Sequence, residues 1–113
     1  MDKRTKYRTL IKRILSDYAK LLSQAPYSKL DTEVISDEQS DNYMLIRVGW
    51  TEQGHARKPT LYVRIRNDKF WIEEDWTEDG IATDLLEAGV PNEDIVLAFH
   101  PPEMRQYTEF AVA

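Results

Sequence analysis

The stretch that decides the fold is the C-terminal run KFWIEEDWTEDGIATDLLEAGVPNEDIVLAFHPPEMRQYTEFAVA, residues 69–113. In order, it predicts a strand, an acidic helix, a turn, a short strand and an aromatic tail. Thr77 is the expected N-cap, because its hydroxyl can accept a hydrogen bond from a backbone amide of the first helical turn. Gly89 and Pro91 are expected to end the helix, since glycine adopts the left-handed conformation readily and proline cannot continue a helix.

The last part of this run predicts a buried strand and a docked tail. Residues 95–99 are continuously apolar over the length of a strand, which indicates burial on both faces. Pro101 and Pro102 break that strand. The apolar residues that follow are Tyr107, Phe110 and Val112. We expect this tail to dock on its own sheet or on a second subunit, because it is too apolar to remain in water.

An amphipathic helix is predicted over residues 3–24, ahead of Pro26, which cannot continue it. One face carries apolar residues at helical spacing and the other face is basic. The apolar stripe consists of Tyr7, Leu10, Ile11, Ile14, Leu15, Tyr18, Leu21 and Leu22. We expect this stripe to form part of the core.

Three further strands are expected between that helix and the C-terminal run, at residues 30–35, 43–50 and 60–66. Alternation divides the second strand between two faces, with Met44, Ile46, Val48 and Trp50 on one and Tyr43, Leu45 and Arg47 on the other. Residues 51–59 have little apolar content and contain a glycine and a proline, so an exposed loop is predicted there.

A two-residue turn at Asn67 and Asp68 predicts a β-hairpin with a defined register. Its pairs are Ile65 with Phe70, Val63 with Ile72, Arg64 with Trp71, and Tyr62 with Glu73. The first two pairs are apolar and share a face, so register and burial agree. On the other face, the Arg64 guanidinium over the Trp71 indole predicts a cation–π contact.

These elements predict one α+β domain over residues 1–113: an N-terminal helix, a four-stranded antiparallel meander, a second helix, a short strand and a docked C-terminal tail. Hydrophobic residues make up 42% and charged residues 31%, as in ordered globular proteins. The absence of cysteine excludes disulfides and thiolate metal sites. With no apolar run of bilayer length and no leader pattern, a cytoplasmic location is expected.

The charge is unevenly distributed along the chain. Residues 1–29 hold eight Lys or Arg against two Asp, net +6, whereas residues 69–113 carry net −9. Two solvated faces of one domain are the simplest interpretation. The alternative is direct DNA binding by the basic helix, through Lys3, Arg4, Arg8, Lys12 and Arg13. The overall charge of −5 opposes nonspecific affinity for phosphate.

No constellation of residues predicts catalysis, a cofactor or a metal. The acidic cluster consists of Glu73, Glu74, Asp75, Glu78 and Asp79. On a strand Glu74 points away from its two neighbours, so a solvated strand-to-helix junction is favoured over the alternative of a metal-dependent nuclease site. His55 and His100 lack the spacing of a zinc pair. Phosphate loops and nucleophile elbows are missing too, so the chain is predicted not to be an enzyme.

Three segments resemble the XisI-like family of element excision controlling factors, described in heterocyst-forming cyanobacteria. They are DNYMLIRVGW at residues 41–50, KFWIEEDWTEDGIATDLLEAGVPNEDIVLAFHPPE at 69–103, and RQYTEFAVA at 105–113. The resemblance implies a role in programmed excision of a DNA element that interrupts a nitrogen-fixation gene region, where a separate site-specific recombinase exchanges the strands. It implies no catalytic residues for this accessory factor.

The resemblance also implies a protein partner, an XisH-like protein, with the recombinase complex as a further expected assembly. Separately, a homodimer through the sheet or the apolar tail is expected. We expect aromatic and charged residues of the C-terminal run to contact that partner, since such residues anchor interfaces. The candidates are Trp76, Glu78, Arg105, Tyr107 and Phe110.

Overall fold

The computed structural model describes residues 2–24 and 29–113, so the predicted helix stop at Pro26 lies outside the described residues. The first helix, α1 (Lys3–Ser23), begins at Asp2, whose side chain accepts a 2.7 Å hydrogen bond from the backbone N–H of Thr5. Its stripe is buried at Tyr7, Ile11, Ile14 and Leu15. Leu21 differs from the prediction: it is 65% exposed, although its neighbour Leu22 packs against the core.

The sheet contains six strands: β1 (Asp31–Asp37), β2 (Asn42–Thr51), β3 (Gly54–Ala56), β4 (Pro59–Arg66), β5 (Lys69–Asp75) and β6 (Ile95–Leu97). Their order is β1-β2-β4-β5-β6, with β3 paired to β2 beside this path. Strands β1, β2, β4 and β5 form the predicted antiparallel meander. The sheet as a whole is mixed, because β6 returns after a helix and pairs with β5 in parallel.

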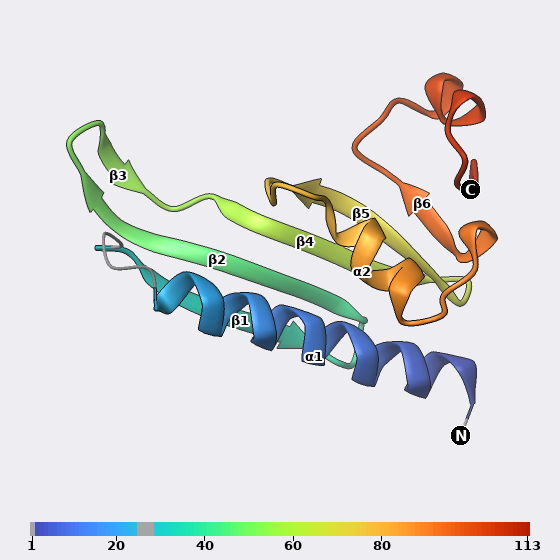
Figure 1. Ribbon diagram of the computed structural model, residues 1–113, viewed down its shortest axis with the longest axis horizontal. Helices are drawn as coiled ribbons and strands as arrows, with labels where there is room; N and C mark the ends of the chain where they lie inside the picture. The colour runs from blue at the N-terminus through green and yellow to red at the C-terminus, as the bar shows by residue number, and fades with distance from the viewer. Residues whose placement is uncertain (1, 25–28) are drawn as a thin grey trace.

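The prediction of a loop over residues 51–59 is wrong in its centre. Strand β3 folds back on β2 and pairs Trp50 with His55, and their rings stack 4.7 Å apart between centroids. This hairpin extends beyond the rest of the sheet (Figure 1). Its three-residue strand offers too few positions for an alternating pattern, so its sequence resembles that of a loop.

The turn at Asn67 and Asp68 is confirmed, with φ values of 54° and 59° that are typical of a type I′ hairpin turn. The predicted pairs hold except for Tyr62, which lies opposite Glu74 because a bulge between Tyr62 and Val63 shifts the register. The predicted cation–π contact of Trp71 is also wrong, because its cation is Arg105 and not Arg64. Arg64 forms an ion pair with Glu73 at 3.4 Å, and the Trp71 ring lies 5.5 Å below Arg105.

The second helix, α2 (Ile81–Glu87), begins later than predicted and Thr77 is not its N-cap. Gly80 is the N-cap residue, and the Asp75 carboxylate accepts the Ile81 N–H at 2.7 Å. The predicted end is confirmed. Gly89 has φ 95°, and the hydrogen bonds from its own N–H to Leu86 and from Val90 to Leu85 form a Schellman motif.

The C-terminal part consists of two short 3-10 helices, η1 (Asn92–Asp94) and η2 (Pro102–Tyr107), on either side of β6. Strand β6 ends at Leu97, two residues before the predicted end, and Phe99 is 47% exposed. The tail docks on its own sheet: Ala111 donates a 2.9 Å hydrogen bond to the Ile95 carbonyl, and Phe110 packs against the core.

Both helices pack on the same face of the sheet. The core between them joins Ile11 and Leu15 of α1, Ile81 and Leu85 of α2, and the strand residues Tyr43, Leu45, Leu61, Val63, Ile65, Phe70 and Ile72. Figure 1 shows α1 along β1 and β2, and α2 in front of β4 and β5. Within the described residues, no helix is long and apolar enough to cross a membrane.

Candidate functional site

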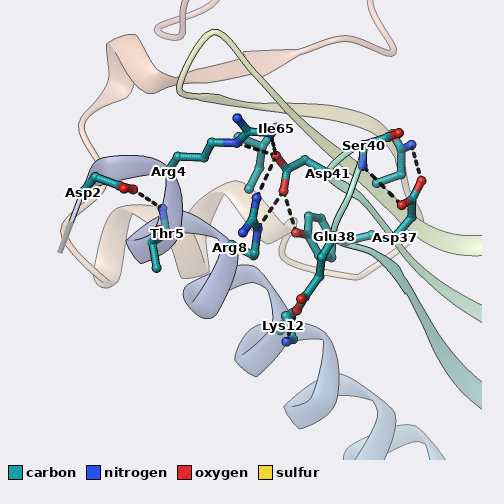
Figure 2. A network of polar contacts seen from close by, with 12 residues as sticks. Asp2, Arg4, Thr5, Arg8, Lys12, Asp37, Glu38, Ser40, Asp41 and Ile65 are labelled. Carbon is teal, nitrogen blue, oxygen red and sulfur yellow. Dashed lines mark hydrogen bonds and ion pairs between the residues drawn. The ribbon is translucent and has the colours of Figure 1, made fainter.

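The most concentrated polar site surrounds Asp41, in the turn between β1 and β2. Its carboxylate is 1% exposed and accepts hydrogen bonds from Nε of Arg4 at 2.7 Å and Nε of Arg8 at 2.9 Å. Tyr43 donates its hydroxyl to the same carboxylate at 2.8 Å. Figure 2 shows both arginines reaching from α1 to this turn. The site therefore joins the N-terminal half of α1 to the sheet.

Asp41 stays ionised at neutral pH. Burial by itself would raise its pKa, but hydrogen bonds from Arg8, Tyr43 and Arg4 outweigh burial and lower the pKa to about 2. The same carboxylate, after burial, raises the pKa of the Tyr43 hydroxyl to about 12. Near neutral pH, Asp41 therefore stays ionised and Tyr43 keeps its proton. The pair stabilises the fold rather than acting as an acid or base.

A hollow of about 480 Å³ borders Asp41 and is lined in part by Arg4 and Arg66. Arg66 donates from Nη1 to the carbonyl oxygens of Ser40 at 2.7 Å and of Asp41 at 3.1 Å. Both arginines thus already bind oxygens of the protein itself. The arginines that line the hollow therefore hold the fold together, and the hollow is not an anion-binding site formed in advance.

Two other carboxylates tie α1 to the C-terminal half. Asp94 accepts from the Tyr7 hydroxyl at 2.6 Å and lies 2.6 Å from the Lys3 ammonium. Burial opposes the charge of Asp94, but the contacts with Lys3 and Tyr7 lower its pKa overall. At the other end of α1, Tyr18 donates to Asp84 of α2 at 2.5 Å. Acids of the negative segment therefore bind the basic and tyrosine residues of α1.

These contacts involve most of the residues predicted for DNA binding. Lys3 pairs with Asp94, Arg4 and Arg8 pair with Asp41, and Lys12 pairs with Glu38. Arg13 instead lines a groove of about 430 Å³ between α1 and α2. Four of the five side chains therefore bind carboxylates of the fold, and Arg4 and Arg8 share one of them.

The residues predicted for partner binding divide into two groups. Trp76, Glu78 and Tyr107 lie on the surface, where Trp76 is 73% and Tyr107 is 77% exposed. Arg105 instead holds the tail in place by donating to the carbonyl oxygens of Ala98 at 3.2 Å and His100 at 3.1 Å. Phe110 is half-buried against the core. Trp76, Glu78 and Tyr107 are thus exposed enough to contact a partner, whereas Arg105 and Phe110 hold the C-terminal tail in place.

The acidic cluster serves the start of α2. Asp75 accepts from both the N–H and the hydroxyl of Thr77, at 2.9 and 2.6 Å, and Glu74 accepts from the Trp76 indole at 2.6 Å. No group of three or more His, Asp or Glu side chains gathers into a metal-binding arrangement in residues 2–24 and 29–113. His55 stacks on Trp50.

Sequence comparison decides the family. The model described as XisI protein matches residues 1–112. The chain belongs to the XisI family. This match confirms the resemblance carried by residues 41–50, 69–103 and 105–113, and it extends the XisI assignment over α1 and the loop segments as well.

Two solved structures share the XisI fold. One is the fdxN element excision controlling factor XisI from Anabaena variabilis ATCC 29413, which is 41% identical over 99% of this chain and 100% of that chain, with a TM-score of 0.85. The other is an XisI-like protein from the same organism, 32% identical over 97% of this chain and 99% of that chain, with a TM-score of 0.87. No curated protein matches the chain.

The sequence contained one signal for the Asp41 site. Asp41 and Tyr43 stand two residues apart in the run that carries the family resemblance, and their side chains are bonded to each other. Nothing local marks Arg4 and Arg8 as their partners, because 37 and 33 residues separate them from Asp41. Sequence reasoning therefore missed the site and considered its arginines only for the alternative of DNA binding.

Proposed function

We propose that this XisI-family chain is a controlling factor for the excision of a DNA element, and that it acts non-enzymatically through protein partners such as an XisH-like protein. The observation that carries the proposal is the 41% identity, over the full length of both chains, to a protein named as an fdxN element excision controlling factor. A name of that kind describes control of excision, and our proposal leaves the strand exchange itself to a separate recombinase.

The structure supports a binding role through the way its polar groups are used. The two buried carboxylates, Asp41 and Asp94, bind cationic and tyrosine side chains of α1 and have lowered pKa values. General acid–base catalysis near neutral pH requires a group whose pKa lies close to the working pH. In contrast, Trp76 and Tyr107 present large aromatic surfaces to solvent, as anchors of protein interfaces do.

Direct DNA binding through α1 is weakened by the ion pairs already described. Affinity for DNA arises largely from Lys and Arg that release counterions from phosphate. Lys3, Arg4, Arg8 and Lys12 would first have to leave carboxylates of their own chain. Each contact with phosphate would replace an ion pair within the chain, so much of the gain in binding free energy is lost.

The experiment combines a binding assay with a gel shift. The full chain is tested by calorimetry against the XisH-like protein of the same organism, and by gel shift against DNA from the element ends at two salt concentrations. We expect a complex with the protein that Trp76→Ala or Tyr107→Ala weakens, whereas Thr9→Ala on the exposed face of α1 leaves it unchanged. Salt-sensitive DNA binding without any XisH-like complex would overturn the proposal.

A cellular measurement tests the role itself. Deleting the gene is expected to lower the fraction of genomes from which the element has been excised, measured across the rejoined ends. Complementation with the intact chain should restore excision and the Trp76→Ala chain should restore it less. If deletion leaves excision unchanged, the chain has no role in excision, whatever partners it binds.

A further inference from the structure

The hairpin formed by β2 and β3 carries positive charge in a chain that is negative overall. Residues 47–60 hold three Lys or Arg against the single acid Glu52, net +2, whereas the whole chain has a net charge of −5. Figure 1 places this hairpin at the opposite end of the molecule from the C-terminal tail. The positive charge therefore lies on a projecting element that a large ligand can reach.

A hollow of about 510 Å³ lies beside this hairpin. Four of the residues that line it carry nitrogen donors: Arg47, His55, Arg57 and Lys58. Among the described residues, no carboxylate lines the hollow. Its volume falls within the range of small-ligand sites, about 300–1,000 Å³. The hollow thus has the size and the sign of charge to admit a phosphate group with its attached sugar.

The two cations at the end of this segment are not engaged with acids of the fold. Arg57 and Lys58 are exposed, and neither forms an ion pair within residues 2–24 and 29–113. This distinguishes them from the basic residues of α1, most of which bind carboxylates of the same chain. A phosphate that contacts Arg57 or Lys58 therefore displaces no internal ion pair.

An exposed indole adjoins the hollow. Trp50 is 72% exposed, and its ring stacks on that of His55, with the two planes 17° apart. His55 also lines the hollow, and its Nδ1 lies 3.1 Å from Nη1 of Arg57. A guanidinium can only donate, so Nδ1 accepts, and the proton of the neutral imidazole lies on Nε2. Trp50, His55 and Arg57 thus form one connected group.

We propose that this hairpin binds single-stranded nucleic acid, with a base stacked on Trp50 and phosphates contacted by Arg57 and Lys58. Sites for single strands combine a positively charged groove with aromatic rings on which bases stack. A duplex offers phosphates but keeps its bases stacked on one another, so the indole would add little to its binding. The presence of both features favours the single strand.

The site goes beyond the proposed protein partnership and does not depend on it. Because the whole chain is negative, repulsion from the rest of the molecule limits the affinity for phosphate, and binding should be strongest at low salt.

The first test measures the electrostatic contacts. The full chain is titrated into a labelled oligothymidylate of about 12 nucleotides, at about 50 and 200 mM salt, and binding is followed by fluorescence anisotropy. Arg57→Gln and Lys58→Gln should each reduce the slope of log affinity against log salt by about 0.7, the contribution of one phosphate contact in a single strand. Arg13→Gln is the matched control: it removes an exposed cation from α1 and should leave the slope unchanged.

The second test measures stacking. Trp50→Ala should weaken binding at least about fivefold at both salt concentrations, the lower range for one stacked base, without changing the slope. Trp50→Phe keeps a ring on which a base can stack and should retain most of the affinity. All these positions are exposed, so the variants should fold, and circular dichroism verifies this.

The outcomes are separable. Absence of binding at the lower salt concentration overturns the inference. A slope that falls in Arg13→Gln but not in Arg57→Gln or Lys58→Gln overturns the hairpin as the site. An unaffected Trp50→Ala, or a duplex of the same length that binds as tightly, overturns the single strand as its ligand. The complex with the XisH-like protein is measured without nucleic acid, so the proposed function can fail or hold independently of this site.

Discussion

Asp41 in the β1–β2 turn and Arg8 on α1 lie 33 residues apart in sequence, yet the Arg8 Nε donates to the Asp41 carboxylate at 2.9 Å. The carboxylate is almost fully buried, whereas the guanidinium still reaches solvent in part. This pair, with Arg4 and Tyr43, connects the helix layer to the sheet at one end of the core. Stability should therefore depend on Asp41 more than on any exposed ion pair of α1.

Asp41→Asn should lower the free energy of unfolding by about 2–4 kcal/mol, because it leaves two guanidinium groups without their buried counter-charge. The measurement is urea denaturation at neutral pH. Glu38→Gln is the matched control, since it breaks the exposed pair with Lys12 and should cost less than about 1 kcal/mol. Equal losses in the two variants would show that burial of Asp41 contributes nothing.

Stability should also fall in acid with a contribution from Asp41. Its pKa is about 2 in the folded chain against an ordinary 3.8, so the folded state binds this proton less readily than the unfolded state. The stability it provides, roughly 2 kcal/mol, is present above the ordinary pKa and is lost as the pH falls through 3.8 towards 2. Denaturation curves over that range should show a shallower acid dependence in Asp41→Asn than in the natural chain.

Asp75, rather than Thr77, should control the start of α2. The Asp75 carboxylate accepts three hydrogen bonds, two from Thr77 and one from the Ile81 N–H at 2.7 Å. Asp75→Ala should cost about 2–3 kcal/mol, because it leaves backbone donors at the helix start unpaired. Thr77→Val keeps the backbone N–H and should cost about 1 kcal/mol. Thermal unfolding compares the two, and the opposite ranking would restore Thr77 as the capping residue.

Gly89→Ala tests the end of α2. An added Cβ would have open space around it, since no atom lies within 4 Å, so any cost arises from the φ value of 95°. The expected loss is about 1 kcal/mol, as for an alanine held in a left-handed conformation. Urea denaturation measures it. The exposed Ala88→Ser provides a control at the preceding position that keeps an ordinary φ, and it should stay within about 0.5 kcal/mol of the natural chain.

Several elements could be predicted because their signals are local. The buried stripe of α1 follows from helical spacing, the hairpin register from the turn at Asn67 and Asp68, and the Schellman motif from Gly89. The register failed only where a bulge displaced Tyr62, since a bulge depends on neighbouring strands and not on the turn.

The candidate site was less predictable. Arg4, Arg8 and Lys12 form a basic helix face in sequence, and a basic face is compatible with DNA as well as with acids of the same chain. Only the approach of Asp41 and Glu38 shows which acids they bind. The prediction of where α2 begins was wrong for a similar reason, because the carboxylate that caps the helix belongs to the preceding strand.

The sequence by itself determined the α+β class, the meander, the end of α2 and the membership of the XisI family. Each depends on spacing within a few residues or on the order of segments along the chain. The tertiary structure alone decided that β6 pairs in parallel with β5, that Asp41 binds Arg4 and Arg8, and that both helices pack on one face of the sheet. These features arise where distant elements meet, and burial there selects the partners of each charge.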